Sequence, residues 1–232
     1  MLIVGLTGGI ACGKSTVSKR LEESYKIPVI DADKIAREIV EPHRDAYNQI
    51  VRHFQAKIPD LLQSDGSLNR VALGKYVFAN HADLKVLNGI THPAVRFEIF
   101  KQILCYYFQG KKMCVLDVPL LFESGLDKFC GVTVSVMCDQ KLQIARICSR
   151  NSELSHQDAE NRIKAQMTHK ERSRRSDYIL ENNDTTELLY GQVQTLVGKI
   201  RPSWTRTILE YFPPFAIVSA LAVVLIKHLR AQ

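Results

Sequence analysis

The chain has 232 residues, enough for one well-buried domain with accessory segments. Its composition of 46% hydrophobic and 24% charged residues is that of an ordinary globular protein, which argues against intrinsic disorder. Lys and Arg outnumber Asp and Glu by 31 to 24, and the net charge of +7 favours an anionic partner such as a phosphate, a nucleic acid or a membrane surface.

The first elements alternate between strand and helix. Residues 2–6 form an apolar run before a tight turn and predict a buried strand. A helical pattern follows over 14–25, then a strand over 27–30 and a helix over 33–40. The N-terminus has no basic region ahead of its apolar run, so we expect no secretory or transit peptide there.

The stretch 45–110 has a different character. It contains several short helical patterns and a long helical pattern from about 93 to 108, with no convincing strand. We interpret it as a helical insertion between the second and third strands.

The alternation resumes after the insertion. Near-continuous apolar runs at 113–118 and 132–138 predict strands buried on both faces, and 178–180 predicts a last short strand. Helices are expected over 140–150, 155–167 and about 185–201, the second beginning with a capping box of Ser155 and Asp158. The pattern predicts an α/β fold, a doubly wound parallel sheet of about five strands.

The first strand leads into a phosphate-binding loop. The sequence GGIACGKS matches G-x-x-x-x-G-K-[ST] at every fixed position, with a strand before it and a helix after it. Glycines let backbone N–H groups curl around phosphates, the lysine reaches the β- and γ-phosphates, and the serine hydroxyl is placed for Mg²⁺. The residues expected to bind ATP here are Gly8, Gly9, Ile10, Ala11, Cys12, Gly13, Lys14, Ser15 and Thr16.

Carboxylates follow two of the expected strands. Asp31 and Asp33 come at the end of the second strand, where the ligand crevice of an open α/β sheet lies. Asp33 is a candidate general base, although it also suits the N-cap of the next helix. Asp117 ends the third strand and can hold Mg²⁺ through water, or alternatively form a turn, and Glu123 is a weaker candidate in the same region.

Basic residues concentrate between 146 and 175. Arg146 and Arg150 lie four apart on one expected helix, and the run 164–175 carries five basic residues against one acidic residue. As a cluster they suit a lid that closes over phosphate charge, whereas each arginine alone more often forms a solvated helix face. The run lacks the interleaved aromatics of a nucleic-acid site, so no nucleic-acid partner is expected.

The C-terminal residues break the α/β pattern. The segment 211–226 carries no charge but is shorter than the ~20 residues that comfortably span a bilayer. Either it packs on the domain, or it seats in a membrane with its basic end at the headgroups. The six cysteines form no C-x-x-C pair, which indicates reduced, mostly buried thiols in an intracellular compartment.

Five segments together resemble the dephospho-coenzyme A kinase family. They are MLIVGLTGGIACGKSTVS, IDADKIAREIV, ITHPAVR, VLDVPLLFE and RNSELSHQDAENRIKAQM, in order and spacing over about residues 1–200. The chain is especially similar to the stand-alone fungal members, which also carry an apolar tail. Ala11, Cys12 and Asp184 stand where the family usually has Gly, Ser and Gly.

The resemblance implies a P-loop kinase-like fold and the last step of coenzyme A synthesis: phosphorylation by Mg²⁺-ATP of the ribose 3′-hydroxyl of dephospho-CoA. It implies a kinase domain over 1–205, with a CoA-binding insertion at 45–110 and a lid at 147–175, and an apolar tail over 206–232. The expected location is the cytoplasm, with the tail attached to the endoplasmic reticulum or the mitochondrial outer surface and a further association with other CoA-synthesis enzymes. The roles carried over are catalysis for Asp33, Lys14 and Arg146, adenine binding for Asn182, substrate binding for Asp31, His92 and Arg96, and metal binding for Ser15 and Asp117.

Other interpretations share some of these features. Another P-loop small-molecule or nucleotide kinase would have the loop and lid but lack the DVPLLFE and THP elements. A regulatory GTPase would need an N-K-x-D guanine-reading motif, which the sequence lacks. A catalytically inactive membrane scaffold is disfavoured because Lys14, Ser15, Asp33 and Asp117 are all intact.

Overall fold

The computed structural model describes residues 1–151, 153–203, 218, 221–226 and 229. They fall into two compact units. The first unit consists of Met1–Ile30 and the described part of Tyr106–Gln232, and the second unit is Asp31–Cys105.

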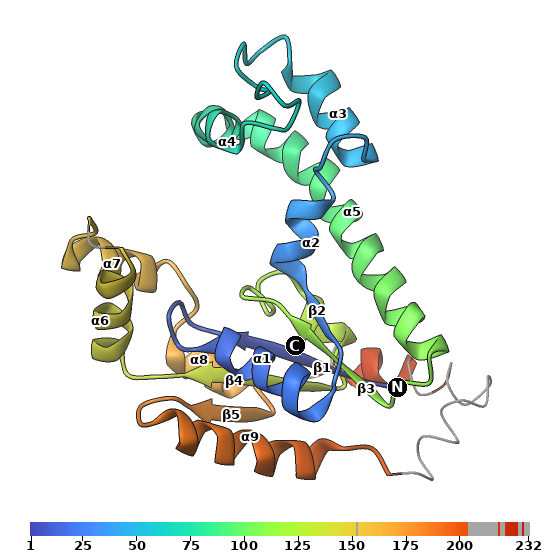
Figure 1. Ribbon diagram of the computed structural model, residues 1–232, viewed down its shortest axis with the longest axis vertical. Coiled ribbons are helices and arrows are strands. Elements are labelled where there is room, and N and C mark those ends of the chain that lie inside the picture. The colour runs from blue at the N-terminus through green and yellow to red at the C-terminus, as the bar shows by residue number, and fades with distance from the viewer. Residues whose placement is uncertain (152, 204–217, 219–220, 227–228, 230–232) are drawn as a thin grey trace. The chain divides into compact units, whose positions relative to one another are not determined.

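A single sheet forms the centre of the first unit (Figure 1). Its five strands lie in the order β2-β3-β1-β4-β5. Strand β1 pairs in parallel with β3 and β4, and β4 pairs in parallel with β5. The expected doubly wound sheet is therefore confirmed, and its strands are β1 (Leu2–Gly8), β2 (Val29–Asp31), β3 (Met113–Asp117), β4 (Val132–Met137) and β5 (Tyr178–Glu181).

The strand order explains where ligands are expected. Strands β2 and β3 lie on one side of β1, and the chain then crosses β1 to form β4 and β5 on the other side, so the strand order reverses at β1. In an open α/β sheet the crevice outside the carboxyl ends at such a reversal is the usual ligand site. The loop that follows β1 lies at this point.

Helices α1 (Lys14–Tyr25) and α9 (Thr186–Ile200) pack with the strands in one apolar cluster. Their buried residues recur at helical spacing, such as Val17 and Leu21 in α1. Against β1 lies the segment around η1 (Leu126–Phe129), so close that a Cβ on Gly5 would be 2.7 Å from Cys130 Sγ. Between β4 and β5 come α6 (Gln140–Arg150), α7 (His156–Lys164) and α8 (His169–Arg175).

The predicted capping box at the start of α7 is confirmed. Ser155 Oγ accepts from the backbone N–H of Asp158, and the Asp158 carboxylate accepts from the backbone N–H of Ser155. The helix ends at Lys164, three residues before the expected end at Met167.

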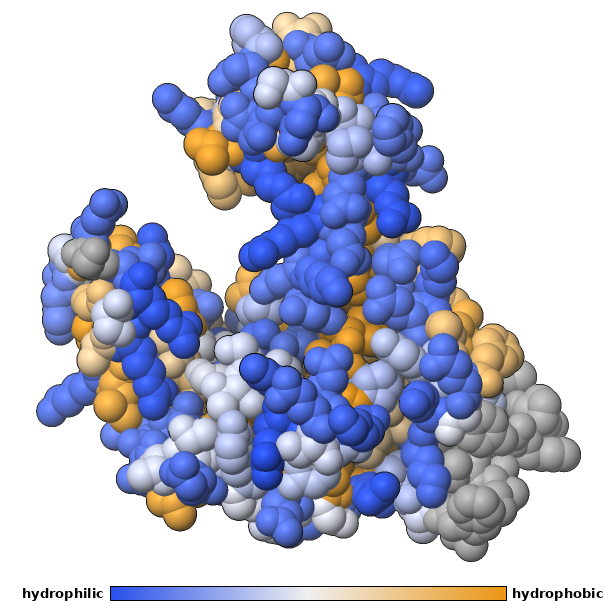
Figure 2. Space-filling model, in the orientation of Figure 1, coloured by the Kyte–Doolittle hydropathy of each residue, from blue (hydrophilic) through white to orange (hydrophobic). Residues whose placement is uncertain are grey.

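The second unit is helical and includes most of the stretch 45–110. It contains α2 (Ala32–Glu38), α3 (Asp45–Phe54), α4 (Arg70–Ala79) and α5 (His81–Phe108) as far as Cys105. Ile50 and Phe54 of α3 are fully buried in its own apolar cluster. Figure 2 shows one face of this unit, and that face is mostly hydrophilic, which is expected for a region that forms its own core.

Helix α5 begins at His81, so the expectation of a helix starting at about Pro93 is wrong. Pro93 lies inside α5, where it removes one backbone hydrogen bond. Leu84, Leu87 and Ile90 precede the proline and pack on the unit's apolar cluster, as does Ala94 after it. This continuous packing holds the helix together across the proline.

The Asp83 carboxylate at the start of α5 contacts residues in and just after α3, within the second unit. Asp83 accepts hydrogen bonds from Lys57 at 2.6 Å and from Tyr76 at 3.1 Å, and lies 3.1 Å from His53 Nε2. The Lys57 ammonium, followed by the His53 ring, lowers the pKa of Asp83 to about 2. The ionised carboxylate therefore stabilises the folded state.

We expect the Asp83→Asn variant to lose the stabilisation that the ionised Asp83 carboxylate gives to the folded state. The pKa is depressed on folding, so the contribution is complete above the unfolded pKa of about 4 and is lost as the pH falls through about 2. Melting temperatures of the variant and the wild type should differ at pH 6 and converge toward pH 2. A constant difference over this range would contradict the assignment.

The predicted apolar tail, 206–232, lies largely outside the described residues. Within the described part of the chain, no helix is both long and apolar enough to cross a membrane.

Candidate active site

The phosphate loop connects β1 directly to α1. Strand β1 ends at Gly8, helix α1 begins at Lys14, and the loop closes on itself through the Cys12 amide, which donates to Gly9 O at 3.1 Å. A Cβ on Gly8 would lie 2.8 Å from Val136 O of β4, so only glycine lets the loop start this close to the sheet.

Two loop residues have positive φ. Gly13 has φ 92° and Ala11 has φ 58°. The left-handed conformation costs a non-glycine residue roughly 1–2 kcal/mol, so Ala11 is held there against its own preference. Hydrogen bonds from Gln143 to Ile10 O and from Arg146 to Ala11 O restrain the loop in this conformation.

Replacing Gly13 with alanine should be severely destabilising. The new Cβ would be strained at φ 92° and would clash with the Asn182 Nδ2 atom. We expect a drop in melting temperature and a loss of ATP binding, measured by thermal denaturation and calorimetry. Gly66→Ala is the matched control: Gly66 has φ 80° but nothing within 4 Å of its added Cβ. Equal destabilisation by the two variants would mean that the Asn182 contact is unimportant.

Two of the residues expected at the site, Lys14 and Asp117, meet in the structure. Lys14 Nζ forms an ion pair with Asp117 Oδ1, and Asp117 is 3% exposed at the end of β3. The register of β1 on β3, which pairs Leu6 with Asp117, brings them together across 103 residues of sequence. Ser15, the other expected metal ligand, is exposed at the start of α1.

Ile10 is held through both of its backbone groups. Its N–H donates to Gln166 Oε1 at 2.9 Å, and its carbonyl accepts from Gln143 Nε2 at 2.9 Å. Gln143 Oε1 in turn lies 3.2 Å from His169 Nε2, which must be the donor because an amide oxygen only accepts. Burial, with the nearby Arg172, lowers the pKa of His169 and favours this neutral ring.

The sequence did not identify Gln143, Gln166 or His169 as members of the site. A neutral side chain that braces a backbone carries no motif, and these contacts depend on the folding of α6 and α8 around the loop. The only available signal was the position of Gln166, four residues after Arg162 within the basic run.

Asn182 and Arg146 brace the other half of the loop. Asn182 Nδ2 donates to Cys12 O at 2.9 Å, and Arg146 donates to Ala11 O at 3.4 Å and to Asn182 O at 3.2 Å. Asn182 is 9% exposed. Both residues therefore lie at the phosphate loop, and their roles toward adenine and phosphate stay predictions.

Arg172 is a buried charge beside the loop. It is 2% exposed, and its Nη1 atom would lie 3.0 Å from a Cβ on Gly9. Among the described residues its Nη2 atom has no hydrogen-bond partner. Burial lowers the pKa of the guanidinium, and Glu123 and Cys12 oppose that shift. The sequence placed this residue only within the basic run.

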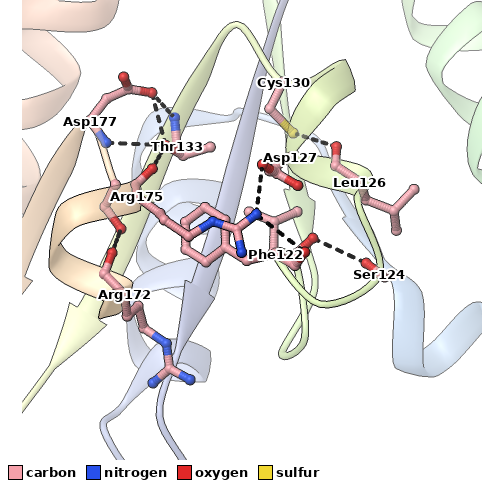
Figure 3. Close-up of polar contacts among 11 residues, drawn as sticks. Phe122, Ser124, Leu126, Asp127, Cys130, Thr133, Arg172, Arg175 and Asp177 are labelled. Atoms are coloured by element: carbon pink, nitrogen blue, oxygen red, sulfur yellow. Dashed lines mark hydrogen bonds and ion pairs between the residues drawn. The ribbon is translucent and has the colours of Figure 1, made fainter. Parts of the chain in front are cut away.

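Helix α8 is anchored so that Arg172 and Arg175 extend in different directions (Figure 3). Arg175 lies 4.7 Å above the Phe122 ring and donates to Asp127 Oδ2 at 3.5 Å. Ser176 Oγ donates to Arg172 O at 2.7 Å and also bonds to Ser135 of β4. These contacts fix the helix to the sheet and explain one role of Phe122 in the DVPLLFE segment.

The acidic pair Asp31 and Asp33 belongs to the second unit. Asp31 is the N-cap of α2 and accepts from the backbone N–H groups of Asp33 and Lys34 at 2.9 and 3.0 Å. The alternative interpretation of Asp33 as the N-cap is therefore wrong, because Asp31 caps the helix. The Asp33 side chain is exposed.

His92 and Arg96 also lie in the second unit, four residues apart on α5, and both are exposed. The structure thus places Lys14, Asp117, Asn182, Arg146 and the loop together in the first unit. The general-base and substrate-side candidates belong to the second unit.

A parallel sheet with a phosphate loop at its reversal point, a loop lysine on a buried strand-end aspartate and basic helices beside the loop define the P-loop kinases. The model of one family, described as dephospho-CoA kinase, matches residues 2–187. The chain belongs to the dephospho-CoA kinase family.

Individual relatives agree. The dephospho-CoA kinase CAB5 of Saccharomyces cerevisiae is 61% identical over 100% of this chain and 96% of its own. The dephospho-CoA kinase of Geobacillus kaustophilus is 44% identical over 80% of this chain and 90% of its own. Among solved structures, the dephospho-CoA kinase of Campylobacter jejuni superposes with a TM-score of 0.66 at 28% identity, covering 86% of this chain and 96% of its own.

Proposed function

We propose that this protein transfers the γ-phosphoryl group of ATP to the ribose 3′-hydroxyl of dephospho-CoA, giving CoA and ADP. The observation that carries the proposal is the loop from Gly8 to Ser15, whose backbone is hydrogen-bonded to side chains of the first unit and which is joined by Lys14 to the buried Asp117. The family and the relatives named dephospho-CoA kinase supply the substrate.

The first unit supplies the ATP side of the reaction. The loop's backbone N–H groups and Lys14 bind the phosphates, and the bracing of Ile10, Ala11 and Cys12 keeps these donors in place before ATP arrives. Such preorganised donors stabilise developing phosphoryl charge without reorganisation cost. Arg146 and Arg172 add positive charge beside the loop.

Mg²⁺ fits the oxygen groups near the loop. Ser15 offers a hydroxyl and Asp117 a carboxylate, the hard oxygen ligands that this ion prefers. The bound ion would neutralise charge on the β- and γ-phosphates.

The second unit supplies the acceptor side. Asp33 accepts the proton of the ribose hydroxyl, and its exposed carboxylate is available for that role because Asp31 caps the helix. Asp31, His92 and Arg96 bind dephospho-CoA.

The test is direct. Purified full-length protein is incubated with ATP, MgCl₂ and dephospho-CoA, and the product is identified as CoA by mass. Adenosine and shikimate serve as alternative acceptors. Phosphorylation of either one in preference to dephospho-CoA would overturn the substrate assignment.

We also propose that the tail over 206–232 attaches the enzyme to an intracellular membrane, where it meets other CoA-synthesis enzymes. The support is its uncharged stretch 211–226, whose apolar surface is costly to leave in water. Exposed apolar side chains at Leu221 and Leu225 agree with this.

A chain ending at Pro202 should stay folded and keep full kinase activity, while the full-length chain sediments with membranes. The expected result follows because a membrane-seated tail contributes nothing to the packing of the domain. Activity, melting temperature and membrane flotation are the measurements. Unfolding after truncation would instead identify the tail as a packing helix.

A further inference from the structure

Two cysteines lie against each other under the phosphate loop. Cys12 is in the loop and Cys138 directly follows β4, and their sulfurs are 3.5 Å apart. Cys12 is 0% exposed and Cys138 3%. The pair arises because β4 is the parallel neighbour of β1, with Val136 in register with Gly8. Both thiols are free.

The surroundings make the two sulfurs chemically different. Arg172 Nη1 and Cys12 Sγ would each lie 3.0 Å from a Cβ on Gly9, so the guanidinium and the sulfur converge on one point. The Cys138 thiol donates to Cys12. This hydrogen bond, followed by others and by Arg172, lowers the pKa of Cys12 despite its burial, whereas the same contact and burial raise the pKa of Cys138.

A thiol of lowered pKa in contact with a thiol of raised pKa is the arrangement of a reactive dithiol. A thiolate is the nucleophile toward an oxidant, and a second thiol in contact completes a disulfide. The cationic Nη2 of Arg172, which has no hydrogen-bond partner among the described residues, adds a charge that the thiolate can compensate.

We propose that Cys12 and Cys138 form an oxidative modification site at which a hydroperoxide produces a disulfide that inactivates the phosphate loop. The Cys12 thiolate attacks the peroxide oxygen, which breaks the O–O bond, gives a sulfenic acid and releases an alkoxide or hydroxide that takes up a proton. The Cys138 thiol then attacks the sulfenic sulfur, the S–S bond forms, and the hydroxyl leaves with the Cys138 proton as water. Two thiols and one hydroperoxide give one disulfide, one alcohol or water, and one further water.

The disulfide must displace the loop. A disulfide requires an S–S distance of about 2.05 Å, well below the 3.5 Å found here. Cys12 is bonded through its amide to Gly9 O and through its carbonyl to Asn182, so moving Cys12 shifts the phosphate-binding backbone. A displacement of about 1 Å in a catalytic constellation lowers the rate about a hundredfold. This consequence for activity rests on the proposed function, whereas disulfide formation does not.

Bound ATP should oppose the oxidation. The nucleotide stabilises the loop in its folded, phosphate-binding geometry, and both sulfurs are buried in that geometry, so neither reacts until the loop opens locally. By reciprocity, the disulfide weakens ATP binding by the same factor by which ATP disfavours the disulfide.

The experiment uses the full-length protein treated with hydrogen peroxide, with and without ATP. Intact mass should fall by two hydrogen atoms, peptide mapping should find Cys12 linked to Cys138, and kinase activity should fall about a hundredfold and return with dithiothreitol. ATP should slow all three changes. Cys138→Ala and Cys138→Ser should keep activity before oxidation and lose the dithiothreitol-reversible inactivation. Cys105→Ser, which removes an exposed thiol, should behave as the wild type.

Two results would overturn the proposal. One is the absence of a Cys12–Cys138 peptide in wild-type protein under conditions that oxidise the exposed Cys105. The other is a quantitative disulfide with unchanged ATP affinity, measured by calorimetry. Neither readout requires the kinase reaction, so failure of this proposal is distinguishable from failure of the proposed function.

Discussion

Replacing Lys14 with alanine is expected to lower kcat roughly a thousandfold, because one charged contact to the transferring phosphate contributes several kcal/mol to the transition state. Turnover with dephospho-CoA is the measurement. Lys19→Ala is the matched control: the residue lies on the same helix with a side chain that is 71% exposed and pairs only with Glu23 among the ion pairs of the described residues. A Lys14→Ala variant with near-wild-type turnover would refute the phosphate-loop assignment.

The structure adds a second consequence of the same change. Lys14 is the ion-pair partner of Asp117, which is 3% exposed, so the variant leaves a buried carboxylate without its cation. Removing one partner of a buried ion pair is destabilising. The melting temperature should therefore also fall.

A double variant separates the two effects. Lys14→Ala combined with Asp117→Asn also removes the buried negative charge and should recover most of the melting temperature. It should recover no activity, because it lacks both the lysine and the carboxylate expected to hold Mg²⁺. Recovery of activity along with stability would mean that Lys14 acts only through the fold.

Replacing Asp33 with asparagine is expected to lower kcat by a factor of roughly a hundred to ten thousand, the usual contribution of a general base. ATP affinity and melting temperature should change little. The side chain is exposed, and the cap of α2 is provided by Asp31. An effect on kcat without an effect on ATP binding identifies a group that acts in the chemical step.

Asp31→Asn is the matched control for this substitution. Asparagine caps helices as well as aspartate, so the variant should keep α2 intact while losing one negative charge. We expect a smaller loss of kcat than in Asp33→Asn. If Asp31→Asn proves the more damaging, Asp31 is the base and the assignment is reversed.

Most secondary structure followed from local patterns. The helix over 14–25 and the helix over 140–150 have the predicted bounds, and the predicted strands differ from the observed ones by at most two residues at either end. Near-continuous apolar runs identify parallel strands because such strands are buried on both faces. The start of α5 was predicted wrongly for a different reason. Proline usually marks the first turn of a helix, but packing on both sides of Pro93 keeps it inside a longer helix.

Local sequence patterns were sufficient to predict the phosphate loop and the order of the strands, whereas helix α8 (His169–Arg175) was not predicted. The phosphate loop can be predicted because its motif lies within one short segment, and glycine, lysine and serine at these fixed positions are typical of phosphate binding. The side chains that surround the loop became known only from the folded structure. Asn182 reaches Cys12 across 170 residues and Gln166 reaches Ile10 across 156. Such pairs depend on which strands become neighbours, and the placement of β4 and β5 beside β1 is a property of the sheet rather than of any one segment. The same reason explains the buried Arg172 and the contact of Cys12 with Cys138, since burial and proximity arise when distant segments pack together.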